Sequence, residues 1–195
     1  MQAFIDFMRD FAQGIMELFY LPPEKDKARD DDSLKRGKKF YQKRLLDFAI
    51  VSACESIRNH PEQRDAYILR GMCFLFKSDD HRAIEDFTQA LNLSSQHTRI
   101  YFFRAVTYCE LQNYDLAVAD FDEALRLHQQ FVEAHNDTAI ESAFSNPFSL
   151  SGLGAEDLVL AYAYRGDAYA REENYIPAIA DFTEVIHRDP LTADI

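Results

Sequence analysis

Apolar and small side chains recur with helical spacing along most of this chain, and the pattern itself repeats. The segment RDAYILRGMCFLFKSDDHRAIEDFTQAL, which begins at Arg64, aligns without a gap with TRIYFFRAVTYCELQNYDLAVADFDEAL, which begins at Thr98. The offset between them is 34 residues. Each segment has two stretches of helical length separated by a short polar turn. The pattern therefore predicts an all-α chain built from helix pairs.

The same spacing marks two further copies. Six positions carry the first alignment: Tyr67 and Tyr101, Arg70 and Arg104, Phe74 and Tyr108, Ala83 and Ala117, Phe87 and Phe121, Ala90 and Ala124. A later copy has Tyr162, Arg165, Gly166, Tyr169, Ala178, Phe182, Val185 and Pro190. An earlier copy keeps Arg36, Gly37, Phe40, Ala49 and Pro61 but has Ala53 and Ser56 in place of Phe and Ala. We expect four helix pairs, the first degenerate.

This pattern resembles the tetratricopeptide repeat, whose signature has an aromatic residue, a Leu-Gly pair, a Tyr, a small Ala, a Phe and a closing Pro. The resemblance covers most of residues 30–192 and implies a superhelical solenoid of helix-turn-helix units. In such a unit, Gly71, Ala83 and Ala90 allow two antiparallel helices to approach, and Phe74 and Phe87 fill the remaining space.

Two details of the repeat lead to specific expectations. The Leu that usually precedes Gly is Arg in all four units, at Arg36, Arg70, Arg104 and Arg165. We expect each aliphatic stem to pack while its charged head reaches water. Turns are predicted at Ser78-Asp79-Asp80, Gln112-Asn113 and Glu173-Asn174, whereas Gln42 to Leu46 contains no turn-forming residue.

The spacing also divides the chain. The distance from Tyr101 to Tyr162 is one period plus 27 residues, which indicates an insertion. The expected parts are an amphipathic helix at 1–21, a charged linker at 22–32, three tandem units within 30–131 (30–63, 64–97 and 98–131), an inserted helix and loop at 132–158, and a fourth unit at 159–192. A tolerated surface insertion is favoured over a partner-contacting loop that carries Phe144 and Phe148.

The amino-terminal helix is expected to have one apolar and one polar face. The apolar stripe is Phe4, Met8, Phe11, Ile15 and Phe19. Leu21-Pro22-Pro23 ends the helix. Its net charge is negative, so packing against protein is favoured over adsorption to anionic lipid. We expect it to dock in the chain's own groove, on a second subunit or on a partner.

The resemblance also implies a binding groove lined by the first helix of each unit. The family's groove positions correspond here to Leu34, Lys38, Tyr41, Ile68, Met72, Leu75, Phe102, Val106 and Cys109. Some family members hold a terminal carboxylate with Lys and Asn at two of these positions, and this sequence lacks that set. The mostly apolar groove predicts an apolar helix or extended peptide as the ligand.

Composition narrows the possible functions. Of the 195 residues, 47% are hydrophobic, which predicts an ordered core. Asp and Glu outnumber Lys and Arg by 33 to 21, and the net charge of -12 disfavours nucleic acid as a partner. Three cysteines without metal-type spacing, together with a charged amino terminus unlike a secretory signal, predict a reduced cytoplasmic protein.

The basic run near the amino end is the one charged cluster that suggests an acidic ligand. It consists of Lys35, Arg36, Lys38, Lys39, Lys43 and Arg44. Asp31 and Asp32 lie four residues before Lys35 and Arg36, so a solvated and internally paired face is favoured over a phosphate site.

The sequence contains no phosphate-binding loop, nucleophile elbow or zinc-protease motif, and its six histidines are scattered. We therefore expect no catalytic residue, no metal and no cofactor. The favoured function is a scaffold or adaptor for an apolar segment of another protein. Alternatives are a small chaperone for an aggregation-prone client and a peripheral membrane assembly factor that uses the amino-terminal helix. Homo-oligomers are compatible with each.

Overall fold

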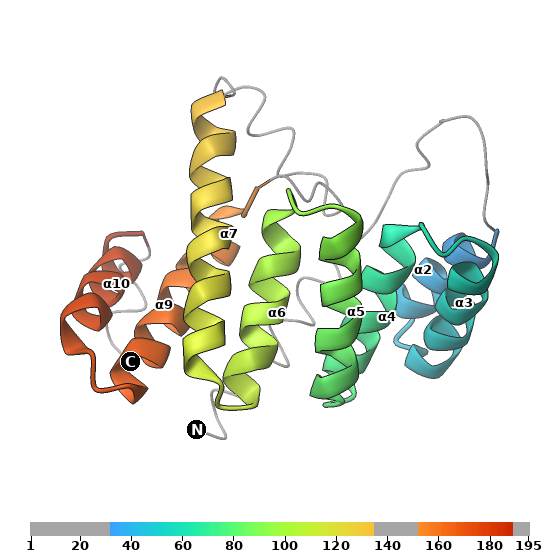
Figure 1. The fold of residues 1–195 in the computed structure, drawn as a ribbon, viewed down its shortest axis with the longest axis horizontal. Coiled ribbons are helices and arrows are strands. Elements are labelled where there is room, and N and C mark those ends of the chain that lie inside the picture. Colours follow the sequence, from blue (N-terminus) through green and yellow to red (C-terminus); the bar gives the residue numbers. More distant parts are fainter. Residues whose placement is uncertain (1–31, 135–151, 189–195) are drawn as a thin grey trace. The chain divides into compact units, whose positions relative to one another are not determined.

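The computed structural model describes residues 32–134 and 152–188, and within them every regular element is a helix. In chain order these are α2 (Asp32–Gln42), α3 (Leu46–Asn59), α4 (Arg64–Phe76), α5 (Asp80–Leu93), α6 (Thr98–Glu110), α7 (Tyr114–Ala134), α9 (Ala155–Arg171) and α10 (Tyr175–Arg188) (Figure 1). The all-α class predicted from the period is confirmed.

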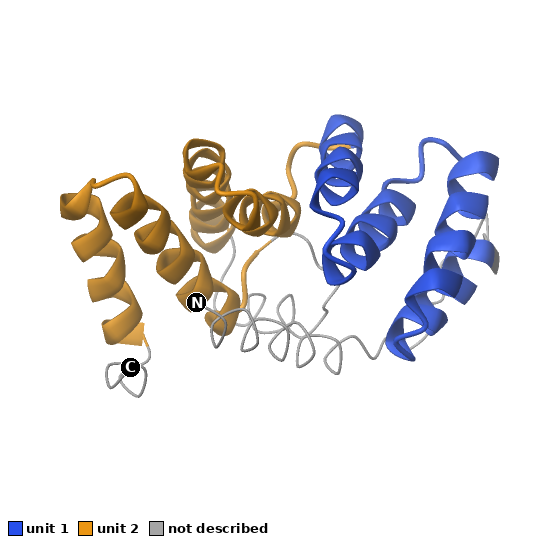
Figure 2. Ribbon diagram, turned by 90° about the horizontal axis from the view of Figure 1, so that it is seen from below, with its two compact units in different colours: residues 1–93, 145–148 blue, residues 94–144, 149–195 orange. Residues whose placement is uncertain are grey.

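The helices fall into two compact units (Figure 2). The described part of unit 1 comprises residues 32–93, with the hairpins α2–α3 and α4–α5. The described part of unit 2 comprises residues 94–134 and 152–188, with the hairpins α6–α7 and α9–α10. In each unit, neighbouring helices pack because each presents an apolar face too wide for one partner to cover.

The four hairpins turn in the same way. In each, one residue has the left-handed backbone conformation: Arg44 (φ 57), Ser78 (φ 56), Gln112 (φ 58) and Glu173 (φ 60). In the first turn the Leu45 N–H donates to the carbonyl of Phe40 at 2.9 Å, and the Arg44 N–H donates to that of Tyr41 at 2.9 Å. This paired bonding closes the end of a helix and satisfies its last carbonyls. The turn therefore forms in the degenerate unit although its sequence has no turn-forming residue.

Small residues bring the two helices of a hairpin together. A Cβ atom added to Gly71 would lie 2.9 Å from Cε1 of Phe87, which is closer than packed carbons approach. Ala83, Ala90 and Phe87 are fully buried on α5, and Phe74 is buried on α4. The packing inferred from the repeat pattern is the packing found.

The helix bounds differ slightly from the divisions expected from spacing. Helix α7 continues to Ala134, past residue 132 where the insertion was expected to begin. Helix α9 begins at Ala155, before residue 159 where the fourth unit was expected to begin. The expected amino-terminal helix, Phe144, Phe148 and the closing Pro190 lie outside the described residues. So does the expected linker, except for Asp32 at the start of α2.

Candidate functional site

Three of the four recurring arginines lie against buried carboxylates, whereas the sequence had suggested that their charged heads reach water. Arg70 donates from Nε and Nη2 to the two carboxylate oxygens of Asp86, at 2.8 and 2.7 Å. Arg104 makes the same forked contact with Asp120 at 2.7 and 2.8 Å, and Arg165 does so with Asp181 at 2.8 and 2.6 Å. All three aspartates are buried on the second helix of their hairpin. The expectation of exposed heads is wrong for these three arginines, because a buried carboxylate accepts two hydrogen bonds from each guanidinium. The Arg36 side chain, in contrast, is 48% exposed.

Aromatic rings lie beside these pairs. The guanidinium carbon of Arg104 lies 5.6 Å from the ring centre of Tyr101 and 5.9 Å from that of Tyr108. That of Arg165 lies 5.6 Å from Tyr162 and 6.0 Å from Tyr169. Such contacts favour the charged guanidinium. The recurring tyrosines therefore stabilise the charge of the arginine on their own helix, and the arginine joins that helix to the second one.

Burial raises the pKa of the Asp86 and Asp120 carboxyls, although the paired arginines act in the opposite direction. The desolvation cost of these aspartates therefore offsets part of the attraction within each pair. These pairs join the two helices of a hairpin.

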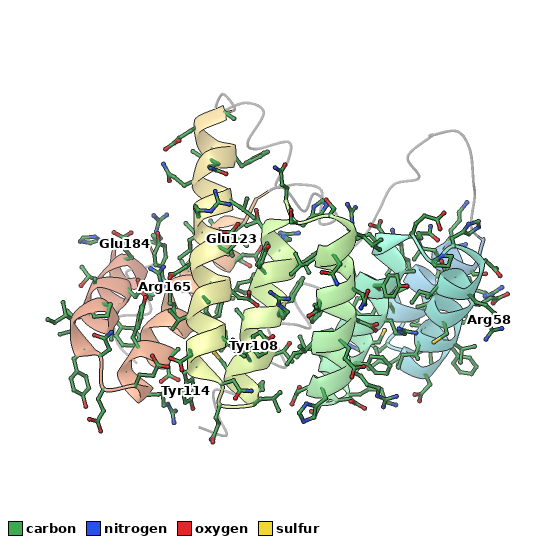
Figure 3. All side chains as sticks on the ribbon, viewed as in Figure 1. Arg58, Tyr108, Tyr114, Glu123, Arg165 and Glu184 are labelled. Carbon is green, nitrogen blue, oxygen red and sulfur yellow. The ribbon has the colours of Figure 1, made fainter. Side chains whose placement is uncertain are left out.

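Arg70 and Arg165 also contact the preceding hairpin of their own unit. Arg70 Nη1 donates to Cys54 Sγ at 3.2 Å, from α4 to α3. Arg165 Nη1 donates to Asp122 at 2.6 Å, from α9 to α7, and Figure 3 shows Arg165 between those helices and α10. Cys54 stands 16 residues before Arg70, and Asp122 stands 43 residues before Arg165 because the insertion lies between them. The two partners occupy equivalent positions of their repeats. One side chain therefore couples the closing of a hairpin to the stacking of two hairpins.

The expected groove residues of unit 1 come together on α2 and α4. Leu34 and Tyr41 are buried on α2, and Ile68 and Met72 are buried on α4, each 5% exposed. The rings of Tyr41 and Phe76 are 5.8 Å apart, which places the two helices side by side. Lys38 and Leu75 are partly exposed. These six residues, Leu34, Lys38, Tyr41, Ile68, Met72 and Leu75, are called the α2–α4 surface below.

The charged member of the α2–α4 surface is neutralised. Lys38 Nζ lies 3.3 Å from the Asp65 carboxylate. Burial alone would raise the pKa of Asp65, but Lys38 and Arg64 beside it hold this pKa below its usual value. The surface therefore presents apolar groups around an ion pair, and not a free cation for a terminal carboxylate.

The expected groove residues of unit 2 differ in how far they are buried. Phe102 is buried with its ring 6.0 Å from that of Phe121, edge to face, so it belongs to the core of the α6–α7 hairpin. Val106 is buried, and Cys109 is partly exposed. Burial raises the pKa of the Cys109 and Cys73 thiols to about 12, so both stay protonated and unreactive at neutral pH.

Two members of the basic run, Arg36 and Lys38, pair with carboxylates on other helices. Arg36 forms an ion pair with Glu55 on α3 and donates to Ser52 at 3.4 Å. Lys38 pairs with Asp65 as described above. The side chains of Asp31 and Asp32 lie outside the description. Ser52 stands where later units have the buried aspartate, which explains why Arg36 turns to the exposed Glu55.

The start of α9 is tied to the rest of unit 2 by polar contacts that sequence reasoning did not identify. Arg99 donates to Asp157 at 2.8 Å, and both side chains are largely buried. The backbone N–H of the fully buried Leu153 donates to His128 Nδ1 at 3.1 Å. Burial, with the charge of Arg188, lowers the pKa of His128, which keeps its ring neutral and able to accept this bond.

In residues 32–134 and 152–188, no three or more His, Cys, Asp or Glu side chains are grouped to hold a metal ion. In the same part of the chain, no helix is long and apolar enough to cross a membrane.

Comparison with known proteins gives the family. The family model described as tetratricopeptide repeat matches residues 65–97 and 98–131. A crystal structure of MamA protein is similar with a TM-score of 0.61 and 17% identity, covering 85% of this chain and 76% of that one. A thermophilic protein of the family from Thermus thermophilus gives 0.55 at 13% identity, covering 85% and 77%.

A third similar structure is the repeat domain of Arabidopsis OM64, with a TM-score of 0.50 and 25% identity, covering 57% of this chain and 88% of that one. The other two matches, at 17% and 13% identity, show the fold alone. Repeats that stack in this way form extended surfaces that support protein–protein interaction. The recurring period, the hairpins and the matched repeats agree, and the chain is a tetratricopeptide-repeat protein.

Proposed function

We propose that this protein is an interaction scaffold whose α2–α4 surface binds an apolar helical segment. We further propose that residues 2–20 of the chain occupy this surface until a partner replaces them. The observation that supports the proposal is the burial of Ile68 and Met72, one turn apart on α4. They lie on the opposite side of α4 from Arg70 and Phe74, since residues two apart on a helix point about 200° apart.

The other sides of α4 have identified partners. Arg70 contacts Asp86 on α5 and Cys54 on α3, and Gly71 meets Phe87 on α5. A helix that is apolar on all sides must be covered on all sides. The face with Ile68 and Met72 therefore needs an apolar cover, and a helix supplies one in a form that matches its length.

The amino-terminal sequence provides a suitable cover. Phe4, Met8, Phe11, Ile15 and Phe19 are spaced by three or four residues and so form one stripe on a helix. If these five side chains are buried at about 1.5–3 kcal/mol each, the gross gain exceeds the cost of docking an attached segment. A partner helix with a similar stripe would compete for the same surface.

The test uses a fluorescent peptide of residues 1–21 and a chain that lacks them. The peptide should bind the shortened chain in the micromolar range and bind the full chain at least about tenfold more weakly, because an attached segment competes at high effective concentration. Leu75→Glu should weaken binding to the shortened chain, whereas Leu116→Glu, at an exposed site on α7, should not.

Thermal unfolding of the shortened chain completes the test. Loss of the segment should lower its melting temperature, because apolar area becomes exposed. A shortened chain that melts like the full chain and does not bind the peptide would contradict the proposal. Phe102 is also one of the expected groove residues, but Phe102→Glu would not test binding, because Phe102 packs in the hairpin core and the variant would unfold it.

A further inference from the structure

The outer face of α2 carries lysines where the next first helix is apolar. On α4, Leu69 lies against Gly37 of the preceding hairpin, and Cys73, one turn later, is also buried. The residues of α2 that stand 34 positions earlier are Lys35 and Lys39, and both are exposed. Within the described residues, no hairpin precedes α2. This face of α2 is therefore a charged surface that does not suit the stacking of a further apolar helix.

Cations gather at the end of this face, beside the turn between α2 and α3. Both carboxylates of α3 already have partners, since Glu55 pairs with Arg36 and Asp47 lies 2.5 Å from Lys77 Nζ on α4. In the part of the chain that the structure describes, three exposed cations near the turn have no carboxylate partner: Lys39, Lys43 and Arg44. Pairing within unit 1 therefore leaves a local excess of positive charge.

This excess is opposite in sign to the protein as a whole. The chain has 33 acidic and 21 basic residues and a net charge of -12. An end hairpin needs a polar outer face for solubility, but charges of either sign would provide one. A group of cations on an acidic protein instead attracts an anionic ligand to one place.

Apolar side chains are exposed beside the cations. Leu45 is 42% exposed and Phe48 is 58% exposed. The ring centre of Phe48 lies 5.4 Å from that of Phe40 on α2. At the position equivalent to Phe48, α5 has Arg82, whose guanidinium lies 4.2 Å from the ring centre of Phe74. The first hairpin thus exposes a ring where the second has a charged group. Five residues, Lys39, Lys43, Arg44, Leu45 and Phe48, are called the α2–α3 turn patch below.

The spacing of the two lysines suits an extended ligand. The Lys43 N–H donates to the carbonyl oxygen of Lys39 at 3.3 Å, so Lys43 stands one helical turn after Lys39. One turn advances about 5.4 Å, and alternate residues of an extended peptide are about 6.6 Å apart. Acidic residues at every second position of a peptide can therefore reach both lysines, and a third can reach Arg44.

We propose that the α2–α3 turn patch binds an extended acidic segment of another protein, with an apolar residue of that segment against Leu45 or Phe48. The neighbouring carboxylates favour a short peptide over a broad polyanion. Asp47 has an 80% exposed side chain, and its contact with Lys77 places the following turn, with Asp79 and Asp80, beside it. A bilayer or a nucleic acid duplex would bring phosphates within a Debye length of these groups, about 8 Å, whereas a short segment avoids them.

Fluorescence anisotropy of the full chain with a labelled peptide, Glu-Ser-Glu-Ser-Glu-Leu-Phe, tests the patch. The carboxyl end is amidated, so that capture of a terminal carboxylate is not measured. The peptide should bind, and a peptide with Gln in place of each Glu should bind at least about tenfold more weakly, because charge pairs hold the segment. Duplex DNA and phosphatidylserine vesicles should not displace the peptide. Displacement by either would overturn the choice of a peptide as the ligand.

Charge reversal tests the location. Lys43→Glu should weaken peptide binding by roughly threefold to tenfold, as the loss of an exposed ion pair and a new repulsion together do. The matched control is Arg58→Glu, because Arg58 is also an exposed cation without a carboxylate partner among the described residues (Figure 3). Arg58 lies about 18 Å further along α3, beyond the Debye length, so the change should be less than about twofold. Equal weakening by the two variants, or no binding to the wild-type chain, would overturn the proposal.

The apolar part of the patch and its independence of the α2–α4 surface need separate variants. Phe48→Ala should weaken peptide binding by roughly threefold, whereas Leu116→Ala, at an exposed apolar site on α7, should not. Leu75→Glu should leave peptide binding unchanged, because Lys38 of the α2–α4 surface and Lys39 point about 100° apart on α2. Melting curves check that each variant is folded. Weaker binding by Leu75→Glu than by Lys43→Glu would show that the acidic segment binds the α2–α4 surface and not the turn patch.

Discussion

The two hairpins of unit 1 have the same turn but different interiors. The α4–α5 hairpin closes around the Arg70–Asp86 pair and the fully buried ring of Phe87. The α2–α3 hairpin has Ser52 and Ala53 at the corresponding positions of α3, and Arg36 pairs with the exposed Glu55. It also leaves Phe48 and Val51 exposed. The comparison indicates that the buried pair and the ring strengthen a hairpin whose path the small residues and the turn already define.

The largest difference should come from the aromatic side chain of α5. Phe87→Ala should lower the free energy of unfolding by about 3–5 kcal/mol, because it removes a buried ring and leaves a cavity. Phe48→Ala in the other hairpin should cost less than about 1 kcal/mol, because that ring is mostly exposed. Urea denaturation of both variants measures the difference. Equal losses would show that the two hairpins do not differ in their cores.

The buried ion pair should give the next largest effect. Asp86→Ala should cost about 3 kcal/mol, because Arg70 then loses its forked partner within the hairpin. Ser52→Ala at the equivalent position of α3 should cost less than about 1 kcal/mol, since the bond from Arg36 to Ser52 is long at 3.4 Å. The measurement is again chemical denaturation. A cost for Asp86→Ala no greater than that for Ser52→Ala would mean that the pair does not stabilise the fold.

The smallest effect should be equal in the two hairpins. Ser78→Gly and Arg44→Gly should each stabilise the protein by about 0.5 kcal/mol, because glycine adopts the left-handed conformation without a Cβ penalty. Both turns have the same two backbone hydrogen bonds. We therefore expect the free energy of unfolding to rise by a similar amount in the two variants. Thermal unfolding followed by circular dichroism can detect the change. A gain at Ser78 with a loss at Arg44 would show that the first turn depends on its arginine side chain.

Much of the fold was predictable because it depends on local spacing. The period placed Gly71, Ala83 and Phe87 on facing sides of two helices, where the structure has them. The role of Arg70 was missed because its partner stands sixteen residues away on another helix. The signal was present, since an aspartate follows the arginine at that distance in three units. The position of His128 against Leu153 had no such signal, because it occurs once and spans 25 residues.

For the candidate sites, too, residue spacing does not show which side chains of different helices meet. Repeat positions selected the residues that form the α2–α4 surface, and they also selected Phe102, whose ring packs on Phe121. They also gave α7 and α10 the same apolar face. Whether that face is covered depends on the neighbouring helix, which is α9 for α7. Periodicity describes one helix at a time and carries no information about what lies across from it.

By itself, the sequence determined the helix pairs, their period and the family, because helix formation and close packing follow from residue spacing and side-chain size. The tertiary structure alone decided which charges are paired, which apolar faces are buried and which remain open. These outcomes depend on desolvation and on contacts between distant segments. The same arginine can therefore face water or a carboxylate, and the same apolar face can form a core or an exposed surface.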